Sequence, residues 1–376
     1  MAKRLLITST DLMMVQFLVP HVIHLSQNGF EVEIACSDVG GRMDEIRQKL
    51  EGFVRAVHTV RLKRSPISPV NFQGYRDMKK LLDSRKYDLI WTNEPVMGVV
   101  TRLAAQKARS QGTKVIYMVH GFHFYKGAPL LNWLVYYPIE KWMAPKADMI
   151  VTINREDYEQ AGKFNVARAE YIHGIGINTE RLSTEGVRGD IRQELHLAQD
   201  DFIVLSVGEL NKNKNQQTIL QALAILNDPK IHYILCGKGD QLTALQQLSA
   251  ELKLEDRVHF LGYRTDVVDI CSRADVFAMP SRREGLPVAS LEAMYCGLPL
   301  ITSNIRGLVD VMENGVSGYM YSPDDAAGFA EGINAIKQSQ QLQMNMSHRN
   351  VKTVQSFCID NARAEVQSLL ESIGLR

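Results

Sequence analysis

The sequence has few cysteines and no long apolar run, and each absence excludes a class of protein. Its 376 residues include five cysteines, scattered without a Cys-x-x-Cys pair, so we expect buried, reduced thiols rather than a disulfide framework. No run of about 18 apolar residues occurs, which excludes a segment that spans a membrane on its own. The apolar stretch near the basic start of the chain is too short for a signal peptide. We therefore expect a cytoplasmic protein.

Metal-ligand patterns and a strong charge of one sign are also missing. No His, Cys and Asp cluster has metal-ligand spacing, and there is no Asp-x-Asp triplet, so we expect neither a metal nor another cofactor. The formal net charge of +1 at pH 7 gives no argument for nucleic acid as a partner. Residues 1–175 nevertheless hold 24 Lys and Arg against 17 Asp and Glu. A basic first half can face an anionic membrane or a pyrophosphate-linked acceptor, or it is simply a solvated surface.

Short apolar runs alternate with amphipathic stretches, which is the pattern of parallel α/β sheets. The length suits two domains, which we place at residues 1–175 and 176–358. Each is expected to be doubly wound and Rossmann-like, and the two are expected to face each other across a cleft at the strand carboxyl ends. The expected strands are residues 5–9, 32–36, 54–60, 89–92, 115–119, 149–153, 171–172, 202–207, 233–236, 258–261, 276–279 and 300–302. The clearest expected helices are residues 14–27, 96–108, 216–226 and 241–252.

The most informative segment is residues 283–299, with the sequence REGLPVASLEAMYCGLP. It places two carboxylates eight residues apart, Glu284 on a Gly/Pro turn and Glu292 inside the helix that follows. Pro287 suits the first helical position, and Gly297 suits the residue just past the helix end. The N–H groups at such a helix start can bind an anion, and the carboxylates can accept hydrogen bonds from sugar hydroxyls. Phosphate and polyol together indicate a nucleotide sugar, whereas a capped helix with solvated glutamates is the alternative.

This segment resembles the signature Glu-Gly-x-Pro-x-x-x-x-Glu-Ala-Met-x-x-Gly-x-Pro of family 4 retaining glycosyltransferases, which have the two-domain GT-B architecture. The resemblance implies that Glu284 binds the donor sugar in catalysis and that Glu292 binds the ribose, neither being a covalent nucleophile. The residues at the helix start that would meet the pyrophosphate or the sugar are Gly285, Leu286, Pro287 and Val288. In this family the last helix crosses back onto the first, acceptor-side domain, so residues 359–376 are expected there.

A second matching stretch follows the first expected strand of the second domain. The family has Gly-Arg-Leu-x-x-x-Lys-Gly here, and its Arg and Lys hold the donor pyrophosphate. Gly208 and Lys214 match this pattern, but Glu209 stands where the Arg is expected. Lys214 is therefore expected to bind the pyrophosphate and to act in catalysis, unless it is a solvated loop lysine. Lys212 or Arg283, the second of which we include among the donor-binding residues, can supply the missing charge.

Two weaker donor-side signals follow the next expected strands. Gly237 and Gly239 resemble the Gly-x-Gly turn of the family, although a tight β–α turn explains this pair equally well. Tyr263 and Arg264 stand where family members contact the nucleobase through backbone groups. We include Gly237, Tyr263 and Arg264 among the donor-binding candidates.

On the acceptor side, His120 ends an expected strand, where many relatives carry a histidine that faces the reacting sugar. Gly121 follows it in place of the usual Asp. His120 is our catalytic and acceptor-side candidate and His123 a second acceptor-side candidate, although a single histidine can be structural. Residues 122–145 carry seven aromatic side chains with lysines nearby. Such a segment packs in the core or lies in a lipid interface, where the basic stretch 55–86 can join it.

Together these features predict an enzyme that moves a hexosyl or N-acetylhexosaminyl group from a nucleotide donor to a glycan. The resemblance implies a UDP-sugar donor, a lipid-pyrophosphate-linked glycan acceptor, retention of configuration, and no metal. It also implies capsule, exopolysaccharide or O-antigen assembly by a protein held peripherally at the inner face of the membrane. Two alternatives remain, a UDP-N-acetylglucosamine 2-epimerase of similar fold and a catalytically inactive nucleotide-sugar-binding scaffold. Glu209 and Gly121 motivate the second.

Overall fold

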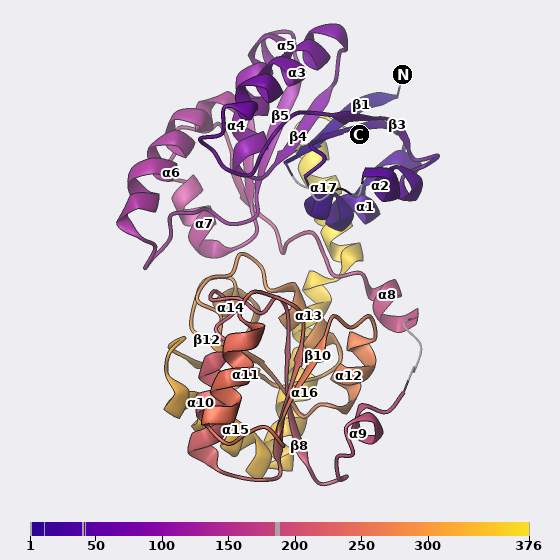
Figure 1. The fold of residues 1–376 in the computed structure, drawn as a ribbon. Coiled ribbons are helices and arrows are strands. Elements are labelled where there is room, and N and C mark those ends of the chain that lie inside the picture. Colours follow the sequence, from indigo (N-terminus) through magenta and orange to yellow (C-terminus); the bar gives the residue numbers. More distant parts are fainter. Residues whose placement is uncertain (1, 11, 40, 42, 185–188, 376) are drawn as a thin grey trace. The chain divides into compact units, whose positions relative to one another are not determined.

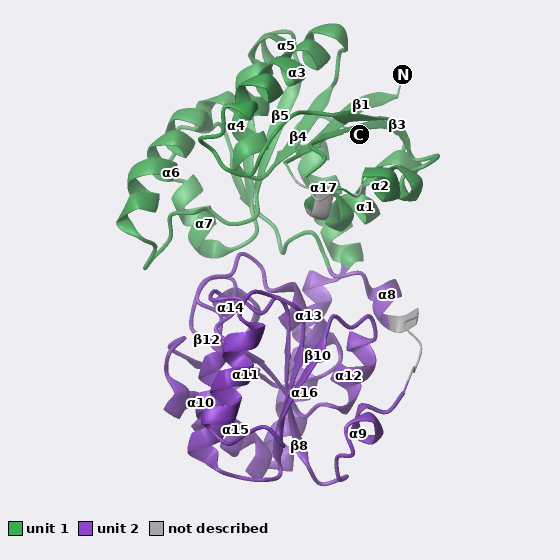
Figure 2. Ribbon diagram, in the orientation of Figure 1, with its two compact units in different colours: residues 1–176, 359–376 green, residues 177–358 purple. Residues whose placement is uncertain are grey.

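The structure, a computed structural model, describes every residue except 1, 11, 40, 42, 185–188 and 376. The chain divides into two compact units, shown in Figures 1 and 2. Unit 1 contains residues 1–176 and 359–376, and unit 2 contains residues 177–358. Each unit is built around its own parallel sheet, which is the α/β class that the sequence predicts.

Within the described residues, unit 1 contains a seven-stranded sheet with the order β3-β2-β1-β4-β5-β6-β7 and parallel pairing throughout. Its strands are β1 (Lys3–Ser9), β2 (Phe30–Cys36), β3 (Val54–Thr59), β4 (Leu89–Asn93), β5 (Lys114–Val119), β6 (Met149–Thr152) and β7 (Ala169–Tyr171). The strand order reverses between β1 and β4. Loops that leave the carboxyl ends of the two strands at such a switch point diverge, and α/β sheets bind ligands there.

Helices cover both faces of this sheet, as a parallel sheet requires. Figure 1 shows α3, α4 and α6 on one side, and α1, α2 and α17 on the other. The helices are α1 (Leu12–Gln27), α2 (Met43–Lys49), α3 (Val70–Ser84), α4 (Pro95–Ala104), α5 (Gln106–Ser110), α6 (Leu130–Met143), α7 (Arg155–Ala161), α17 (Ile359–Ser372) and the 3-10 helix η1 (Ala144–Lys146). Although α17 follows unit 2 in the sequence, it packs against α1 in unit 1.

Unit 2 contains, in its described part, a six-stranded parallel sheet with the order β10-β9-β8-β11-β12-β13. Its strands are β8 (Phe202–Val207), β9 (Ile231–Cys236), β10 (Val258–Gly262), β11 (Val276–Met279), β12 (Leu300–Ser303) and β13 (Gly318–Tyr321). Its helices are α8 (Thr179–Thr184), α9 (Ile191–Glu194), α10 (Gln217–Leu226), α11 (Leu242–Glu251), α12 (Val267–Arg273), α13 (Val288–Tyr295), α14 (Leu308–Val311), α15 (Ala326–Gln338), α16 (Gln340–Val354) and the 3-10 helix η2 (Gln355–Phe357). The switch point here lies between β8 and β11.

Alternation along β8 distributes its side chains between two cores. Leu205 belongs to the core that holds Leu291 of α13. Val204 belongs to the opposite core, which holds Leu220 of α10 and Phe329 of α15. Successive residues of a strand point to opposite faces, so an apolar run in β8 binds helices on both sides of the sheet.

The structure corrects the sequence-based elements at three places. The short edge strand β13 is not among the strands expected from the sequence. The helix expected at residues 96–108 is divided into α4 and α5 at Ala105. Pro287 is the residue before α13 rather than its first residue, because its ψ of 82° is not helical. Gly297 follows the end of α13 with a φ of +80°, as expected for a glycine at that position.

Among the residues that the structure describes, no helix combines the length and the apolar character needed to cross a bilayer. Within the same residues, no group of three or more His, Cys, Asp and Glu side chains is arranged to hold a metal ion. All five cysteines are thiols, and four of them are buried. Burial raises the pKa of the Cys36 thiol to about 12, so this thiol stays protonated at neutral pH.

Candidate functional site

Lys214 and Glu284 meet at the switch point of the unit 2 sheet. Lys214 lies in the loop after β8, and Glu284 lies in the turn after β11. The ammonium Nζ of Lys214 donates to Oε1 of Glu284 at 2.8 Å, across 70 positions of sequence. The two side chains are 23% and 11% exposed, so the pair is mostly buried but still accessible to a ligand. The ammonium has three donors and the carboxylate two oxygens, which leaves capacity for a ligand.

Backbone contacts hold these two loops together. The N–H of Arg282 donates to the Asn213 carbonyl at 2.8 Å, and Nδ2 of Asn213 donates to the Arg283 carbonyl at 3.0 Å. On the other side of Lys214, Oδ1 of Asn211 accepts its backbone N–H at 2.9 Å. The position of the Lys214 ammonium is therefore set by hydrogen bonds that come from both loops.

Close approach of backbone explains two glycines beside this pair. A Cβ at Gly237 would lie 1.8 Å from the Gly208 carbonyl oxygen, which no side chain allows. A Cβ at Gly307 would lie 2.5 Å from the carbonyl oxygen of Gly285, in the turn that carries Glu284. The glycines thus let the ends of β8 and β9 touch, and let the β12 loop support the Glu284 turn.

Helix α13 begins directly after the Glu284 turn. The N–H groups in the first turn of a helix have no helical carbonyl to bond, so they can face an anion. Farther along α13, the Glu292 carboxylate is only 16% exposed and forms an ion pair with Arg181 of α8. Arg181 could not be predicted from the sequence, because no spacing rule links two residues that lie 111 positions apart.

Glu209, which replaces the arginine of the family pattern, is exposed, and its Oε2 accepts a hydrogen bond from Nδ2 of Asn211 at 3.0 Å.

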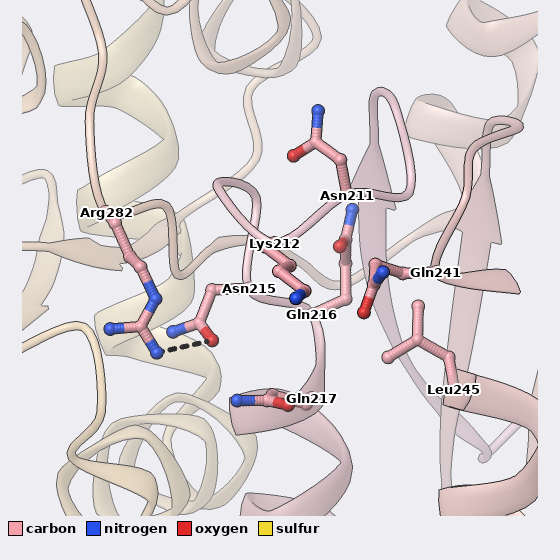
Figure 3. A pocket seen from close by; sticks show the side chains of 8 residues that line it. All are labelled: Asn211, Lys212, Asn215, Gln216, Gln217, Gln241, Leu245 and Arg282. Atoms are coloured by element: carbon pink, nitrogen blue, oxygen red, sulfur yellow. Dashed lines mark hydrogen bonds between the residues drawn. The ribbon is translucent and has the colours of Figure 1, made fainter.

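Lys212 lies in a hollow of about 260 Å³ beside the Lys214 loop (Figure 3). The hollow is lined by Asn211, Lys212, Asn215, Gln216, Gln217, Gln241, Leu245 and Arg282. Arg282 donates to Asn215 at 3.2 Å and to Asp324 at 2.7 Å. Arg282 and Arg283 are both exposed, and the side chain of Arg282 is held on this loop by its bond to Asn215.

Arg264 is committed to contacts within unit 2. Its guanidinium donates to Asp266 at 2.8 and 2.7 Å and to Glu194 at 2.7 and 3.0 Å. The hydrogen bonds that Arg264 donates to Asp266, and then those to Glu194, raise the pKa of Arg264 above its ordinary value. Tyr263 is 73% exposed. At this strand end the phenol ring of Tyr263 and the backbone are thus the groups that can reach a ligand.

In unit 1, His120 lies at the carboxyl end of β5 and contacts Asn93 at the end of β4. The His120 Nε2 lies 3.0 Å from Oδ1 of Asn93, and Nδ2 of that amide donates to the Thr8 carbonyl at 3.1 Å. Since Oδ1 of Asn93 can only accept, Nε2 of His120 carries the proton and Nδ1 is the acceptor. Burial lowers the pKa of His120 to about 4, so the ring is neutral at pH 7.

Glu94, the residue after Asn93, is a functional candidate that was not expected from the sequence. Its Oε2 accepts hydrogen bonds from the Ser9 hydroxyl at 2.6 Å and from the Thr10 N–H at 2.8 Å. Its φ of +64° is unusual for a residue with a side chain. The carboxylate therefore ties the end of β4 to the end of β1, at the switch point of unit 1. Polar residues directly after the buried strand β4 were the available signal.

His123 is held by packing. Its ring stacks on Tyr136 of α6 with centroids 4.5 Å apart, and its carbonyl accepts a hydrogen bond from Nδ2 of Asn132 at 2.9 Å. These contacts fix the loop that leads into α6. His123 thus packs on α6, whereas His120 lies among the polar groups at the strand ends.

The depressed pKa of His120 gives the first prediction. Folding lowers this pKa from 6.5 to about 4, so the unfolded chain binds more protons between these values. The contribution of His120 to the free energy of unfolding therefore falls as pH drops from 6.5 towards 4. NMR titration of the imidazole, assigned with His120→Gln, should show no midpoint near neutral pH. A midpoint between pH about 6 and 7 would show a solvated ring and contradict the geometry.

Comparisons with known proteins follow the same division of the chain. Residues 187–353 match the family Glycosyl transferases group 1, and residues 19–181 match Glycosyltransferase Family 4. The putative glycosyltransferase EpsD of Bacillus subtilis (strain 168) is 35% identical over 364 residues, which cover 95% of this chain and 93% of EpsD. The UDP-Gal:alpha-D-GlcNAc-diphosphoundecaprenol alpha-1,3-galactosyltransferase of Escherichia coli is 27% identical, with 89% and 87% coverage. The crystal structure of Anabaena HepE in complex with UDP and glucose matches with a TM-score of 0.77 at 20% identity, covering 98% of this chain and 100% of HepE.

Two parallel-sheet units, each with polar groups at its switch point, and the likeness to HepE over nearly the whole chain show the GT-B fold. The similarity to EpsD over nearly the whole chain places the protein more closely: this chain belongs to glycosyltransferase family 4. The resemblance that rests on residues 283–299 is thereby confirmed. The protein is a glycosyltransferase.

Proposed function

We propose that this glycosyltransferase moves a sugar from a UDP-sugar to a lipid-pyrophosphate-linked glycan, with retention and without a metal. The observation that carries the proposal is the Lys214–Glu284 pair beside the start of α13. A cation and a helix N-terminus suit a pyrophosphate, and a carboxylate next to them suits the hydroxyls of the attached sugar.

Each part of the donor can be assigned a binding group in unit 2. Lys214 and the first N–H groups of α13 would bind the pyrophosphate, and Glu284 would accept hydrogen bonds from the sugar. Glu292 would bind the ribose, and a ribose at this carboxylate has to share it with Arg181. The identity of the nucleotide as UDP is supported by the HepE complex and by the UDP-galactose donor of the E. coli relative.

In the proposed reaction, the acceptor oxygen bonds to the anomeric carbon on the face from which the phosphate leaves. The bond to the phosphate oxygen breaks, and that oxygen takes the acceptor proton. Lys214 and the N–H groups of α13 stabilise the negative charge that develops on the leaving diphosphate. We assign neutral His120 to the acceptor side, where Nδ1 can accept a hydrogen bond. Retention itself is an expectation from the family.

The acceptor class rests on chemistry outside the donor site. The E. coli relative is named for transfer to a diphosphoundecaprenol-linked sugar, and EpsD aligns over most of the chain. The excess of lysine and arginine in residues 1–175 suits an anionic, pyrophosphate-linked substrate. We therefore place the reaction in the assembly of a bacterial surface polysaccharide, with a hexosyl or N-acetylhexosaminyl group transferred.

The test is a transfer assay with a panel of UDP-sugars and an undecaprenyl-diphosphate-linked acceptor. We expect product with retained configuration by NMR, turnover that survives EDTA, and loss of most turnover in Glu284→Ala. Turnover lost in EDTA and restored by magnesium would contradict the metal-independent reaction. Conversion of UDP-N-acetylglucosamine without acceptor would favour an epimerase, and UDP binding without transfer across the panel would favour an inactive scaffold.

A further inference from the structure

Helix α6 of unit 1 presents an apolar face to solvent. Four side chains of this face are largely exposed, namely Leu130 (73%), Leu131 (68%), Leu134 (65%) and Trp142 (60%). Val135 and Ile139 extend the same face, each with 37% exposed. The spacing of these residues follows the helical period, so they form one stripe. Figure 1 shows α6 at the outer edge of unit 1.

The opposite face of α6 holds the helix rigidly on unit 1. Trp133 and Tyr137 pack on Phe124, with ring centroids 5.5 and 5.3 Å apart. The Glu140 carboxylate is buried and accepts a hydrogen bond from Arg102 at 2.8 Å. Most aromatic rings of the segment therefore lie in the core, and the exposed stripe is mainly aliphatic. Of the two alternatives that the sequence left open, core packing therefore describes most of these rings.

Within positions 122–146 the exposed charges are all positive. Glu140 is the only acidic residue in positions 122–146, and it points inward. The basic residues of this stretch are Lys126, Lys141 and Lys146. The Lys146 ammonium lies 5.0 Å from the centroid of the Trp142 ring. Lysines that extend from the rim of an apolar surface can place their ammonium groups at the level of anionic lipid headgroups.

We propose that the exposed face of α6 docks the protein on an anionic bilayer, with its leucines and Trp142 in the interface. The 14-residue helix is about 21 Å long, too short to cross a hydrocarbon core of about 30 Å, so it lies in the membrane plane. A second copy of the chain is a poorer occupant, because symmetric pairing of this face would bring Lys141 and Lys146 of the two copies together. The proposal stands independently of the proposed reaction, although a lipid-linked acceptor would be found at the same surface.

The experiment is co-sedimentation of the full chain with vesicles of phosphatidylcholine, with and without phosphatidylglycerol. We expect binding that needs the anionic lipid, and partitioning that is weaker by about tenfold or more in Leu131→Glu/Leu134→Glu. A matched control is Ile225→Glu in unit 2, an exposed apolar residue of α10 (58%), which should bind as the wild type does. UDP binding by both variants, measured without lipid, reports folding and the donor site separately.

Two outcomes would overturn the proposal. One is that the double variant binds vesicles as the wild type does, and that Trp142→Phe keeps the same lipid-induced fluorescence shift as the wild type. The other is a wild-type dimer that the double variant converts to a monomer, with neither protein bound to vesicles. A lipid-induced blue shift that disappears in Trp142→Phe would support the proposed orientation of α6.

Discussion

Replacing Lys214 with alanine is expected to lower kcat by about 10²–10³-fold, the loss typical of removing one preorganised group that stabilises developing negative charge. The ammonium is fixed by its 2.8 Å bond to Glu284 and by the backbone bond to Asn211, so it costs little reorganisation during the reaction. Affinity for UDP should fall as well, because in the proposed reaction the same cation binds the diphosphate before the bond breaks. Initial rates at saturating donor, with UDP binding by calorimetry, separate the two effects.

Lys212→Ala is the matched control for this result. Lys212 lies two positions away in the same loop, but it is exposed and lines the neighbouring hollow. Because Lys212 lines the hollow and Lys214 contacts Glu284, we expect Lys212→Ala to lose much less kcat than Lys214→Ala, even if Lys212 adds charge near the pyrophosphate. A second variant, Lys214→Arg, keeps the charge and changes its geometry, and should recover part of the rate. Wild-type kcat in a folded Lys214→Ala protein would remove this lysine from the reaction.

Replacing Glu140 with alanine is expected to destabilise unit 1 by about 3–5 kcal/mol, because it leaves the Arg102 cation buried without its carboxylate. Arg102 is fully buried, and its guanidinium lies 3.9 Å from the centroid of the Tyr117 ring. Tyr117 also donates its hydroxyl to Glu140 at 3.0 Å. The substitution therefore removes the acceptor of two buried donors.

Tryptophan fluorescence during urea unfolding is the measurement, since Trp91, Trp133 and Trp142 all lie in unit 1. Lys141→Ala, at the next, exposed position, should change the free energy of unfolding by no more than about 0.5 kcal/mol. Replacing Arg102 with methionine in the Glu140→Ala chain should restore part of the loss, because no unpaired cation is then buried. A loss below about 1 kcal/mol for Glu140→Ala would show that water reaches Arg102.

The sequence predicts most strands of both sheets, because parallel strands buried on both faces are continuous apolar runs. The runs at 202–207 and 276–279 coincide with β8 and β11. The same pattern does not identify β13, because its four residues include a glycine and two tyrosines rather than an apolar run. This segment is a strand because it pairs with β12. A glycine there is required because a Cβ on Gly318 would lie 1.8 Å from the Leu300 carbonyl oxygen.

The candidate site shows a similar division. Lys214 and Glu284 could be selected from local motifs, and the structure places them in contact. The partner of Glu292 could not, because Arg181 reaches it from a helix far away in the sequence. The pairing of Arg264 with Glu194 is likewise a long-range contact. Local motifs therefore identify the functional side chains at the strand ends. The oppositely charged partners of these side chains depend on tertiary packing, which the motifs do not contain.

The last helix has a consequence for the order in which the protein is made. Four residues of α17, Ile359, Ala362, Val366 and Leu370, are buried in unit 1, and a Cβ on Gly176 would lie 2.6 Å from the Ile359 Cα. Residues 1–176 leave the ribosome before all of unit 2, and α17 leaves after it. Unit 1 must therefore wait with an incomplete core while unit 2 is synthesised, so a chaperone has its longest access to the first half of the chain.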